Sequence, residues 1–295
     1  MSLNPVTSTF VETLRDALPH GVIRKATPNY LEEPRGRWAG QAGVVVAPAN
    51  TAEVAEVIRM AHAAAVPVIP YGGGTGLVGG QIVSDGPAPL LLSLERMRAI
   101  RGIYPEENAM IVEAGAILSD VHEAALDANR LYPLSIAAKG SARIGGLLST
   151  NAGGVNVLRY GNARELCLGI EAVLPDGQIY HGLKRLRKDN AGYDLKDLLI
   201  GSEGTLGVIT AATLRLAPRP AGEGTALMVV DSPQAALSLL SLARDHMGEG
   251  ISAFELMHRA GLEFLAETLP VSRQPFAAMP EWFILIDVGL ARGLD

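Results

Sequence analysis

The chain has 295 residues, of which 48% are hydrophobic, 19% charged and 5% aromatic, a composition that excludes a disordered tail and allows a sizeable core in about two domains. The formal charge is −6, from 25 Lys and Arg against 31 Asp and Glu, so nothing favours a polyanionic partner such as a nucleic acid. The single cysteine, Cys167, excludes an internal disulfide and a multi-cysteine metal site, and no apolar run is long enough to predict a transmembrane helix.

The first quarter of the chain predicts an alternation of helix and strand. We expect a helix over Ser8–Ala17 and a buried strand over residues 43–47. Asn50 with Glu53 three positions later has the pattern of a capping box, which starts a second helix. Residues 67–70 then return to a strand. A strand–helix–strand opening predicts parallel pairing in the first sheet.

The middle of the chain predicts further short strands and one helix. Residues 90–93 and 110–114 have the apolar character of strands, and residues 119–128 form an amphipathic helix. Two strands flank the Pro-Asp-Gly turn at residues 175–177, which indicates a hairpin. An alternating strand over residues 213–216 closes this part of the chain.

Two prolines, Pro218 and Pro220, mark a linker. We therefore expect one domain over residues 1–217 and a second over residues 218–295. The second domain reads as strand, helix, strand, helix and strand, which predicts an α+β arrangement. The five expected elements are residues 226–230, 234–246, 251–256, 259–267 and 282–288.

Six of the nine residues from 72 to 80 are glycine. Gly74, Gly76 and Gly79 match the spacing of a dinucleotide-binding fingerprint, but that motif also needs a helix opening at the loop and an acidic residue about 20 positions later. The residues after Gly80 cannot start a useful helix, which disfavours a nicotinamide-dependent enzyme. We favour an anion cradle formed by converging backbone N–H groups over the alternative of a flexible spacer.

Two later glycine blocks carry small polar side chains. In residues 144–154, Thr150 and Asn151 are suited to bind the edge of a heterocycle, while the glycines admit a flat ring; the alternative is a tight turn between domains. Residues 201–209 present backbone groups in a similar way. One long, bent ligand explains three such blocks better than three separate turns do.

Other chemistry is sparse. The six histidines show no metal-ligand spacing, no Gly-x-Ser-x-Gly motif occurs, and we predict no metal site. Cys167 lies between leucines and is expected to be buried and inert. Arg159, Arg164 and Lys188 flank the glycine blocks and either balance a phosphate or form ordinary surface charge. We therefore assign no catalytic residue.

At these blocks the sequence resembles the FAD-binding domain of the vanillyl-alcohol oxidase and p-cresol methylhydroxylase flavoprotein superfamily. The matching stretches are residues 70–80, 144–154, 159–161, 188–195 and 201–210. Within that superfamily the chain is most similar to the branch that contains D-2-hydroxyglutarate dehydrogenase, D-lactate dehydrogenase and the flavin subunit of glycolate oxidase. The resemblance runs from about Arg35 to the end of the chain.

The resemblance implies an α+β fold in which two subdomains, meeting near residue 102 within a core match over residues 35–217, hold FAD, followed by part of a substrate or cap domain. Residues 70–77 would wrap the diphosphate, residues 140–146 and 149–154 would line the flavin and ribityl chain, and residues 203–209 would close on the adenine half or the ring edge. The FAD-binding residues implied are Pro70, Tyr71, Gly72, Gly73, Gly74, Thr75, Gly76, Leu77, Gly80, Pro133, Gly140, Ser141, Ile144, Gly145, Ser149, Thr150, Asn151, Gly153, Gly154, Tyr160, Gly161, Glu203, Gly204, Gly207, Val208 and Ile209. Members with covalent FAD place a histidine where this chain has Gly74, so non-covalent FAD is implied.

The same resemblance implies an oxidoreductase that converts a D-2-hydroxy acid to the 2-oxo acid, with hydride transfer to flavin N5 and a separate electron acceptor. In this branch the later part of the cap supplies the metal-binding histidines, the substrate-binding arginine and the catalytic histidine, and none has a counterpart here. A flavin-binding module without turnover is therefore the alternative. The first ten residues lack the features of a signal peptide, so we expect a cytoplasmic protein. We leave a homodimer open.

Overall fold

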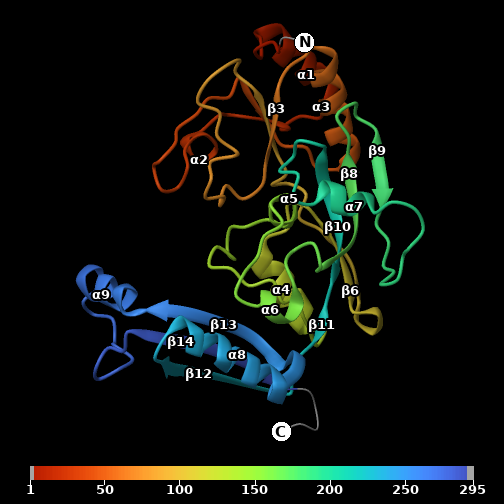
Figure 1. Cartoon of the computed structure of the whole chain (residues 1–295). Coiled ribbons are helices and arrows are strands. Elements are labelled where there is room, and N and C mark those ends of the chain that lie inside the picture. The colour runs from red at the N-terminus through yellow and green to blue at the C-terminus, as the bar shows by residue number, and fades with distance from the viewer. Residues whose placement is uncertain (1–2, 291–295) are drawn as a thin grey trace. The chain divides into compact units, whose positions relative to one another are not determined.

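The computed structural model describes residues 3–290, which form two compact units (Figure 1). The first unit contains residues 3–132, Ala137–Ala152 and Ala163–Pro218. The second contains Pro133–Ile136, Gly153–Asn162 and residues 219–290. The chain passes from the first unit to the second for the last time between Pro218 and Arg219, within the predicted linker. The two short excursions of the chain into the second unit, at residues 133–136 and 153–162, were not expected. The predicted division into domains stays a prediction.

A four-stranded sheet occupies the N-terminal part of the first unit, with the order β1-β2-β4-β3. Both β2 and β3 run parallel to β4, which confirms the parallel pairing expected from the strand–helix–strand opening. The elements of this part are α1 (Ser8–Ala17), β1 (Ile23–Arg24), α2 (Pro28–Leu31), β2 (Val44–Val46), α3 (Thr51–Ala63), β3 (Val68–Tyr71) and β4 (Leu90–Ser93). The predicted bounds of α1 and β4 are correct, those of β2 and β3 differ by one residue at each end, and β1 and α2 were not predicted.

The helix α3 begins where the capping pattern predicts. The Asn50 side chain accepts a hydrogen bond from the Glu53 N–H at 2.9 Å. The Glu53 carboxylate accepts from the backbone N–H of Ala49 at 2.7 Å rather than from that of Asn50, one residue earlier than in a standard capping box. Apolar side chains spaced along one face of α3, including Val54 and Val57, are fully buried and join the core of this sheet.

A five-stranded sheet follows, with the order β5-β6-β10-β8-β9 and antiparallel pairing throughout. The pairing of β8 with β9 confirms the predicted hairpin. β10 begins at Val208, five residues before the predicted strand, because it pairs with β8 from Val208 onward. The elements here are β5 (Ile100–Tyr104), β6 (Ala109–Glu113), α4 (Leu118–Asp127), β7 (Arg130–Leu131), α5 (Ile144–Ser149), β8 (Cys167–Val173), β9 (Ile179–Gly182), α7 (Leu195–Leu199), β10 (Val208–Arg215) and β11 (Ala217–Pro218). β5, α5 and α7 were not predicted, nor was a short 3₁₀ turn, η1 (Pro105–Glu107).

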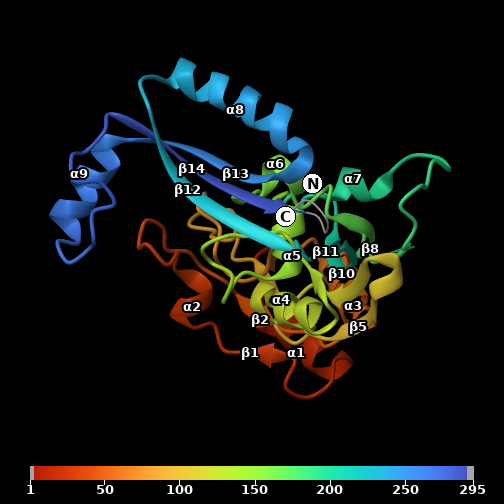
Figure 2. The same cartoon turned by 90° about the horizontal axis from the view of Figure 1, so that it is seen from below.

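The second unit is built on an antiparallel three-stranded sheet with the order β12-β14-β13. All five elements expected beyond the linker are present: β12 (Gly222–Val230), α8 (Pro233–Met247), β13 (Ile251–His258), α9 (Arg259–Thr268) and β14 (Trp282–Leu290). The short η2 (Gly248–Gly250) precedes β13. α8 lies along the sheet (Figure 2), where Ala236, Ile251, Ile284 and Ile286 form a small core.

The excursion over residues 153–162 belongs to this second unit through α6 (Val157–Tyr160), which packs against β13. The Arg159 guanidinium donates to the carbonyl oxygen of Gly289 at 2.8 Å. It also lies 3.4 Å from the carbonyl oxygen of Gly250 and from the Ser252 hydroxyl. Arg159 therefore binds carbonyl groups of its own unit. It fits neither of the two expected roles, which were balancing a phosphate and forming ordinary surface charge.

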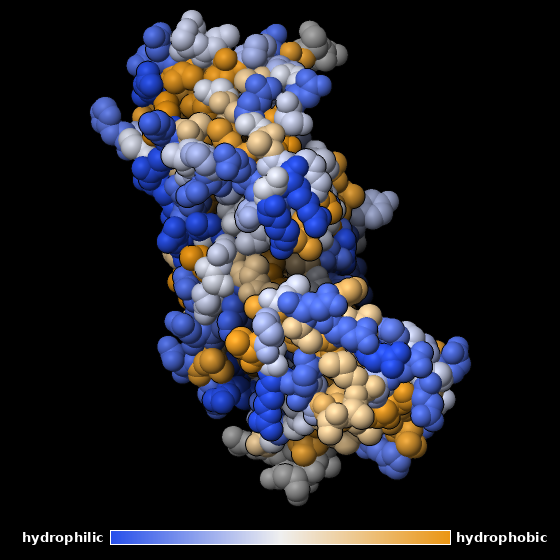
Figure 3. Space-filling model, turned by 90° about the vertical axis from the view of Figure 1, so that its left-hand side faces the viewer, coloured by the Kyte–Doolittle hydropathy of each residue, from blue (hydrophilic) through white to orange (hydrophobic). Residues whose placement is uncertain are grey.

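Large hydrophobic side chains remain exposed on both units, and in the space-filling view they lie among hydrophilic residues (Figure 3). Leu77 and Val78 in the first unit and Val229 and Phe264 in the second are more than half exposed. No helix within residues 3–290 is long and apolar enough to cross a membrane.

Candidate functional site

The first glycine block is a loop that follows β3, and its backbone lies directly against the second block. A Cβ atom added at Gly73 would lie 2.2 Å from the carbonyl oxygen of Ser141, far inside ordinary contact. A Cβ added at Gly72 would lie 3.3 Å from the Cα atom of Gly146. Glycine is therefore required at residue 73 because two backbone segments meet there.

The third block contacts both of the others. A Cβ at Gly204 would lie 2.8 Å from a ring carbon of Pro70, at the start of the first block. The backbone N–H of Glu203 donates to the carbonyl oxygen of Ser149 at 2.9 Å, and that of Gly201 donates to Leu148 at 3.0 Å. The structure thus brings together three segments that are more than 50 residues apart in sequence.

The loop leaves backbone donors available. Within the described residues, none of the N–H groups of residues 73–77 donates a hydrogen bond to another protein group. Gly74 is buried and has a φ of +68°, a conformation that favours glycine. Free N–H groups in a loop made mostly of glycine can bind a phosphate group, which is the role that the sequence predicts.

The second block begins with a helix that was not predicted from the sequence, because residues Ile144–Ser149 form α5. A Cβ at Gly145 would lie 2.7 Å from the Cβ of Ala114, and the Gly145 N–H donates to the Ala114 carbonyl at 2.7 Å. At least this glycine therefore serves close packing of α5 on the end of β6. Gly140 is different, since a Cβ there would meet nothing within 4 Å.

The two side chains expected to bind a heterocycle are partly engaged within the protein. The Thr150 hydroxyl donates to the carbonyl oxygen of Gly146 at 3.0 Å. The side-chain oxygen of Asn151 accepts the backbone N–H of Arg164 at 3.0 Å, and Asn151 has a φ of +47°. In the described part of the chain the Asn151 amide nitrogen donates to no protein acceptor. Its N–H groups are therefore available to donate hydrogen bonds to a ligand.

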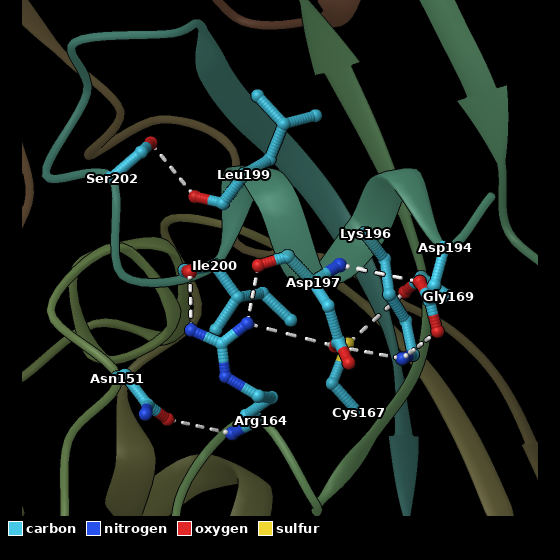
Figure 4. A network of polar contacts seen from close by, with 10 residues as sticks. All are labelled: Asn151, Arg164, Cys167, Gly169, Asp194, Lys196, Asp197, Leu199, Ile200 and Ser202. Atoms are coloured by element: carbon cyan, nitrogen blue, oxygen red, sulfur yellow. Dashed lines mark hydrogen bonds and ion pairs between the residues drawn. The ribbon is translucent and has the colours of Figure 1, made fainter.

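Arg164 holds the second and third blocks in position (Figure 4). Its guanidinium donates to the carbonyl oxygens of Asp197 and Ile200, the latter at 2.8 Å, and lies 3.9 Å from the Asp197 carboxylate. Asp197 lies in α7, and Ile200 directly precedes Gly201. The Arg164 side chain is therefore engaged by protein groups just before the third block while its backbone contacts Asn151, which corrects the expectation that Arg164 balances a phosphate or forms plain surface charge.

The remaining predicted FAD residues lie in several places. Pro133, Gly153, Gly154, Tyr160 and Gly161 belong to the second unit. Val208 and Ile209 are buried in β10, so only their backbone is available near the third block. Leu77, in the first block, is 59% exposed.

Tyr71 donates its hydroxyl to the carbonyl oxygen of Asn29 at 2.7 Å and packs edge-on against Tyr30, with ring centroids 5.4 Å apart. Burial, together with a hydrogen bond to Glu95, raises the pKa of Tyr30 to about 12. Tyr71 thus anchors the first glycine block to α2, and neither Tyr30 nor Glu95 was predicted from the sequence.

Arg143, which immediately precedes α5, was also missed. One of its terminal nitrogens donates to the carbonyl oxygen of Gly115 at 2.8 Å, while its Nε is buried without a hydrogen-bond partner in the described residues. The signal was present, because an arginine stands out among the small residues of 140–146.

Cys167 is buried, and burial raises the pKa of its thiol to about 12, as expected of an inert residue. Among residues 3–290, no group of three or more His, Cys, Asp or Glu side chains is placed to hold a metal ion. The lack of a metal site stays a prediction.

Comparison with known proteins identifies the domain around these blocks. Residues 42–182 match the FAD binding domain family. These residues have the sequence of an FAD binding domain. FAD is accordingly its cofactor, and the α+β fold expected from the resemblance is confirmed.

The relatives that match most of this chain are longer proteins. The chain is 38% identical over 277 residues to the mitochondrial D-2-hydroxyglutarate dehydrogenase of Bos taurus, with 91% of this chain and 50% of the relative covered. It is 34% identical over 252 residues to the D-2-hydroxyglutarate–pyruvate transhydrogenase of Saccharomyces cerevisiae, with 85% and 50% covered. It is 36% identical over 251 residues to the D-2-hydroxyglutarate dehydrogenase of Xanthomonas citri, with 85% and 52% covered. The chain thus spans about half the length of these relatives.

Solved structures support the fold independently. The FAD domain and the rest of the chain are similar to alkyldihydroxyacetonephosphate synthase, with a TM-score of 0.80, 18% identity, and 99% of this chain and 57% of that chain covered. At this identity the likeness concerns the fold alone.

Proposed function

We propose that this chain is the FAD-binding part of an oxidoreductase that oxidises a D-2-hydroxy acid to the 2-oxo acid. The observation that carries the proposal is the meeting of the three glycine blocks in a chain whose relatives are named as D-2-hydroxyglutarate dehydrogenases. When bound, FAD supplies the two-electron acceptor for oxidation of the alcohol carbon.

The described residues fit the diphosphate of FAD. The free N–H groups of residues 73–77 would hold the phosphate oxygens, since a close backbone approach is possible only where Gly73 has no side chain. The predominantly glycine loop provides this approach at low steric cost. No side chain of the first block places a positive charge there, so the backbone itself carries the interaction.

The other two blocks would orient the rest of the cofactor. Asn151 would direct its amide N–H groups to the ligand while its oxygen stays bound to the Arg164 N–H. Glu203, held with a φ of +51° by its bond to Ser149, would shape the opposite wall. Close packing of Gly145 in α5 against Ala114, at the end of β6, would hold the second block in position.

The test uses the full chain saturated with FAD under anaerobic conditions. D-2-hydroxyglutarate, D-lactate or glycolate is added and the visible absorbance of the flavin is followed, with L-2-hydroxyglutarate as the control. Bleaching by one D-hydroxy acid and not by its L-enantiomer supports the proposal. A stable oxidised spectrum with every substrate, in protein that retains stoichiometric FAD, would instead identify the chain as a flavin-binding module without turnover.

Several finer predictions belong to this proposal. They are the identity of the hydroxy acid, glycolate among them, non-covalent attachment of FAD, a separate electron acceptor, a homodimer and a cytoplasmic location. The bovine relative is named as mitochondrial and the Xanthomonas citri relative is not, so fractionation of the source cells is the measurement that decides the compartment.

A further inference from the structure

A second concave site lies in the first unit, apart from the glycine blocks. It is a cavity of about 280 Å³ between the β8–β9 hairpin and the segment over residues 183–197. None of the residues predicted to bind FAD lines it. Its volume is just below the range of small-molecule pockets and suits a ligand of a few heavy atoms.

Most of the charged groups that line the cavity are already paired. The Lys184 ammonium lies 2.6 Å from the Asp189 carboxylate, and the Lys196 ammonium lies 2.8 Å from the carboxylates of both Asp194 and Asp197. The Lys184 ammonium, together with the backbone N–H of Ala191, lowers the pKa of Asp189 and keeps it ionised. The acidic side chains of this segment are thus occupied by its lysines.

Two arginines of the lining are not paired in this way. In the described part of the chain, the guanidinium groups of Arg187 and Arg215 make no hydrogen bond or ion pair with a protein group. Arg215 projects from the end of β10 and is partly buried. Burial, and after it the positive charge of Arg187, lowers the pKa of Arg215.

Arg187 and Arg215 line one cavity without an ion-pair partner of their own and repel each other, and this repulsion is screened less at the partly buried Arg215 than at Arg187, which is exposed. An anion between them would relieve the repulsion and would occupy donors that otherwise have only water. Guanidinium groups bind planar or tetrahedral oxyanions through paired N–H groups, which makes arginine well suited to phosphate and carboxylate.

We propose that the cavity lined by Arg187 and Arg215 is a binding site for a compact oxyanion with two negative charges, a phosphate group or a small dicarboxylate. The site is separate from the FAD loops, and it stands whether or not the chain turns over a hydroxy acid. Arg164 lines the same cavity and bonds to the residue before Gly201 (Figure 4), so a ligand there would contact the residues that support the third glycine block.

The experiment is calorimetric titration of the full chain, saturated with FAD, with inorganic phosphate and separately with succinate, at an ionic strength held constant with sodium chloride. The variants are Arg187→Gln and Arg215→Gln. Arg187 lies outside any helix or strand, so its replacement leaves the sheets intact. The matched control is Arg185→Gln, whose side chain pairs with Glu107 and does not line the cavity.

We expect one of the two anions to bind the wild-type protein, and each cavity variant to weaken that binding by at least about tenfold, the loss of one charge-assisted contact. Arg185→Gln should change it by less than about twofold, because exposed pairs contribute little. Binding of phosphate alone or succinate alone identifies which oxyanion the site takes. Absence of binding by both anions, or equal binding by wild type and both cavity variants, overturns the proposal.

Discussion

Replacing Gly73 with alanine is the most direct test of the predicted cofactor loop. The added Cβ would lie 2.2 Å from the Ser141 carbonyl oxygen, which is 1.2 Å closer than the 3.4 Å at which ordinary contact begins. It would also lie 3.1 Å from the Cα of Ala142. Both obstacles are backbone, so a side-chain rotation cannot relieve them and the loop itself must move away.

The magnitude follows from what that movement costs the bound state. Forcing one extra carbon into a packed contact costs about 1 to 3 kcal/mol, and each N–H group displaced from a phosphate oxygen loses about 1.5 to 3 kcal/mol. The apo loop can relax, so most of the cost falls on FAD binding. A loss of about 3 to 5 kcal/mol raises the FAD dissociation constant roughly 100- to 4,000-fold. Valine, with its branched Cβ, should abolish binding.

The assay is titration of apoprotein with FAD, followed by quenching of flavin fluorescence, with a thermal melt of each apoprotein to check folding. The matched control is Gly261→Ala in α9, outside the predicted FAD residues, because a Cβ there meets nothing within 4 Å and the helical backbone suits alanine. It should bind FAD within about threefold of wild type. Folded Gly73→Ala protein with wild-type affinity would show that the loop is a spacer and that the cradle argument is wrong.

Four further predictions follow from the described contacts. Acid precipitation of the holoprotein should release all yellow colour, and flavin retained in the pellet would contradict non-covalent attachment. Native Cys167, with its pKa raised to about 12, should react with a disulfide reagent at pH 8 at least about 100-fold more slowly than free cysteine, and at the normal rate in urea. Arg164→Ala should leave the carbonyls of Asp197 and Ile200 unpaired, lower the free energy of unfolding by about 1 to 3 kcal/mol and weaken FAD binding; unchanged urea midpoints would refute this. Burial opposes ionisation of Glu171, but bonds from Thr51 and Arg101 outweigh the effect of burial and lower the pKa of Glu171. The stabilising effect of the Glu171 carboxylate is therefore present above the unfolded pKa of about 4.3 and is lost as the pH falls through the folded pKa. The stability difference between wild type and Glu171→Gln should therefore shrink below about pH 4, and a constant difference would contradict the assignment.

Elements with a long, regular pattern were predicted well from the sequence. α1, α8 and the strands of the second unit each carry enough local periodicity or β-branched character to specify themselves. β5 was missed because its five residues alternate weakly and include Gly102, and it is defined by pairing with β6. α5 was missed because two of its six residues are glycine, and long-range contacts with the end of β6 hold it.

The sequence predicts which segments form the candidate site, but it does not predict how these segments contact one another. The glycine blocks are visible in the sequence, but nothing local indicates that Gly73 meets Ser141 or that Gly204 meets Pro70. The roles of Arg164 and Arg143 could not be read from their neighbours, because their partners are backbone carbonyls that come close only on folding. Because every residue has a backbone carbonyl, such a partner cannot be identified from a residue type in the sequence.

The excursion at Gly153–Asn162 has a consequence for synthesis on the ribosome. Arg159 is made 130 residues before Gly289, whose carbonyl it binds, and α6 is made long before the strand β13 against which it packs. During translation Arg159 and α6 wait for these partners, although Val155 and Asn156 bond to the carbonyl groups of Ser135 and Pro133, which are made earlier. A contact over so many residues forms late and slowly, so α6 remains without its packing partner on the nascent chain until β13 has been made.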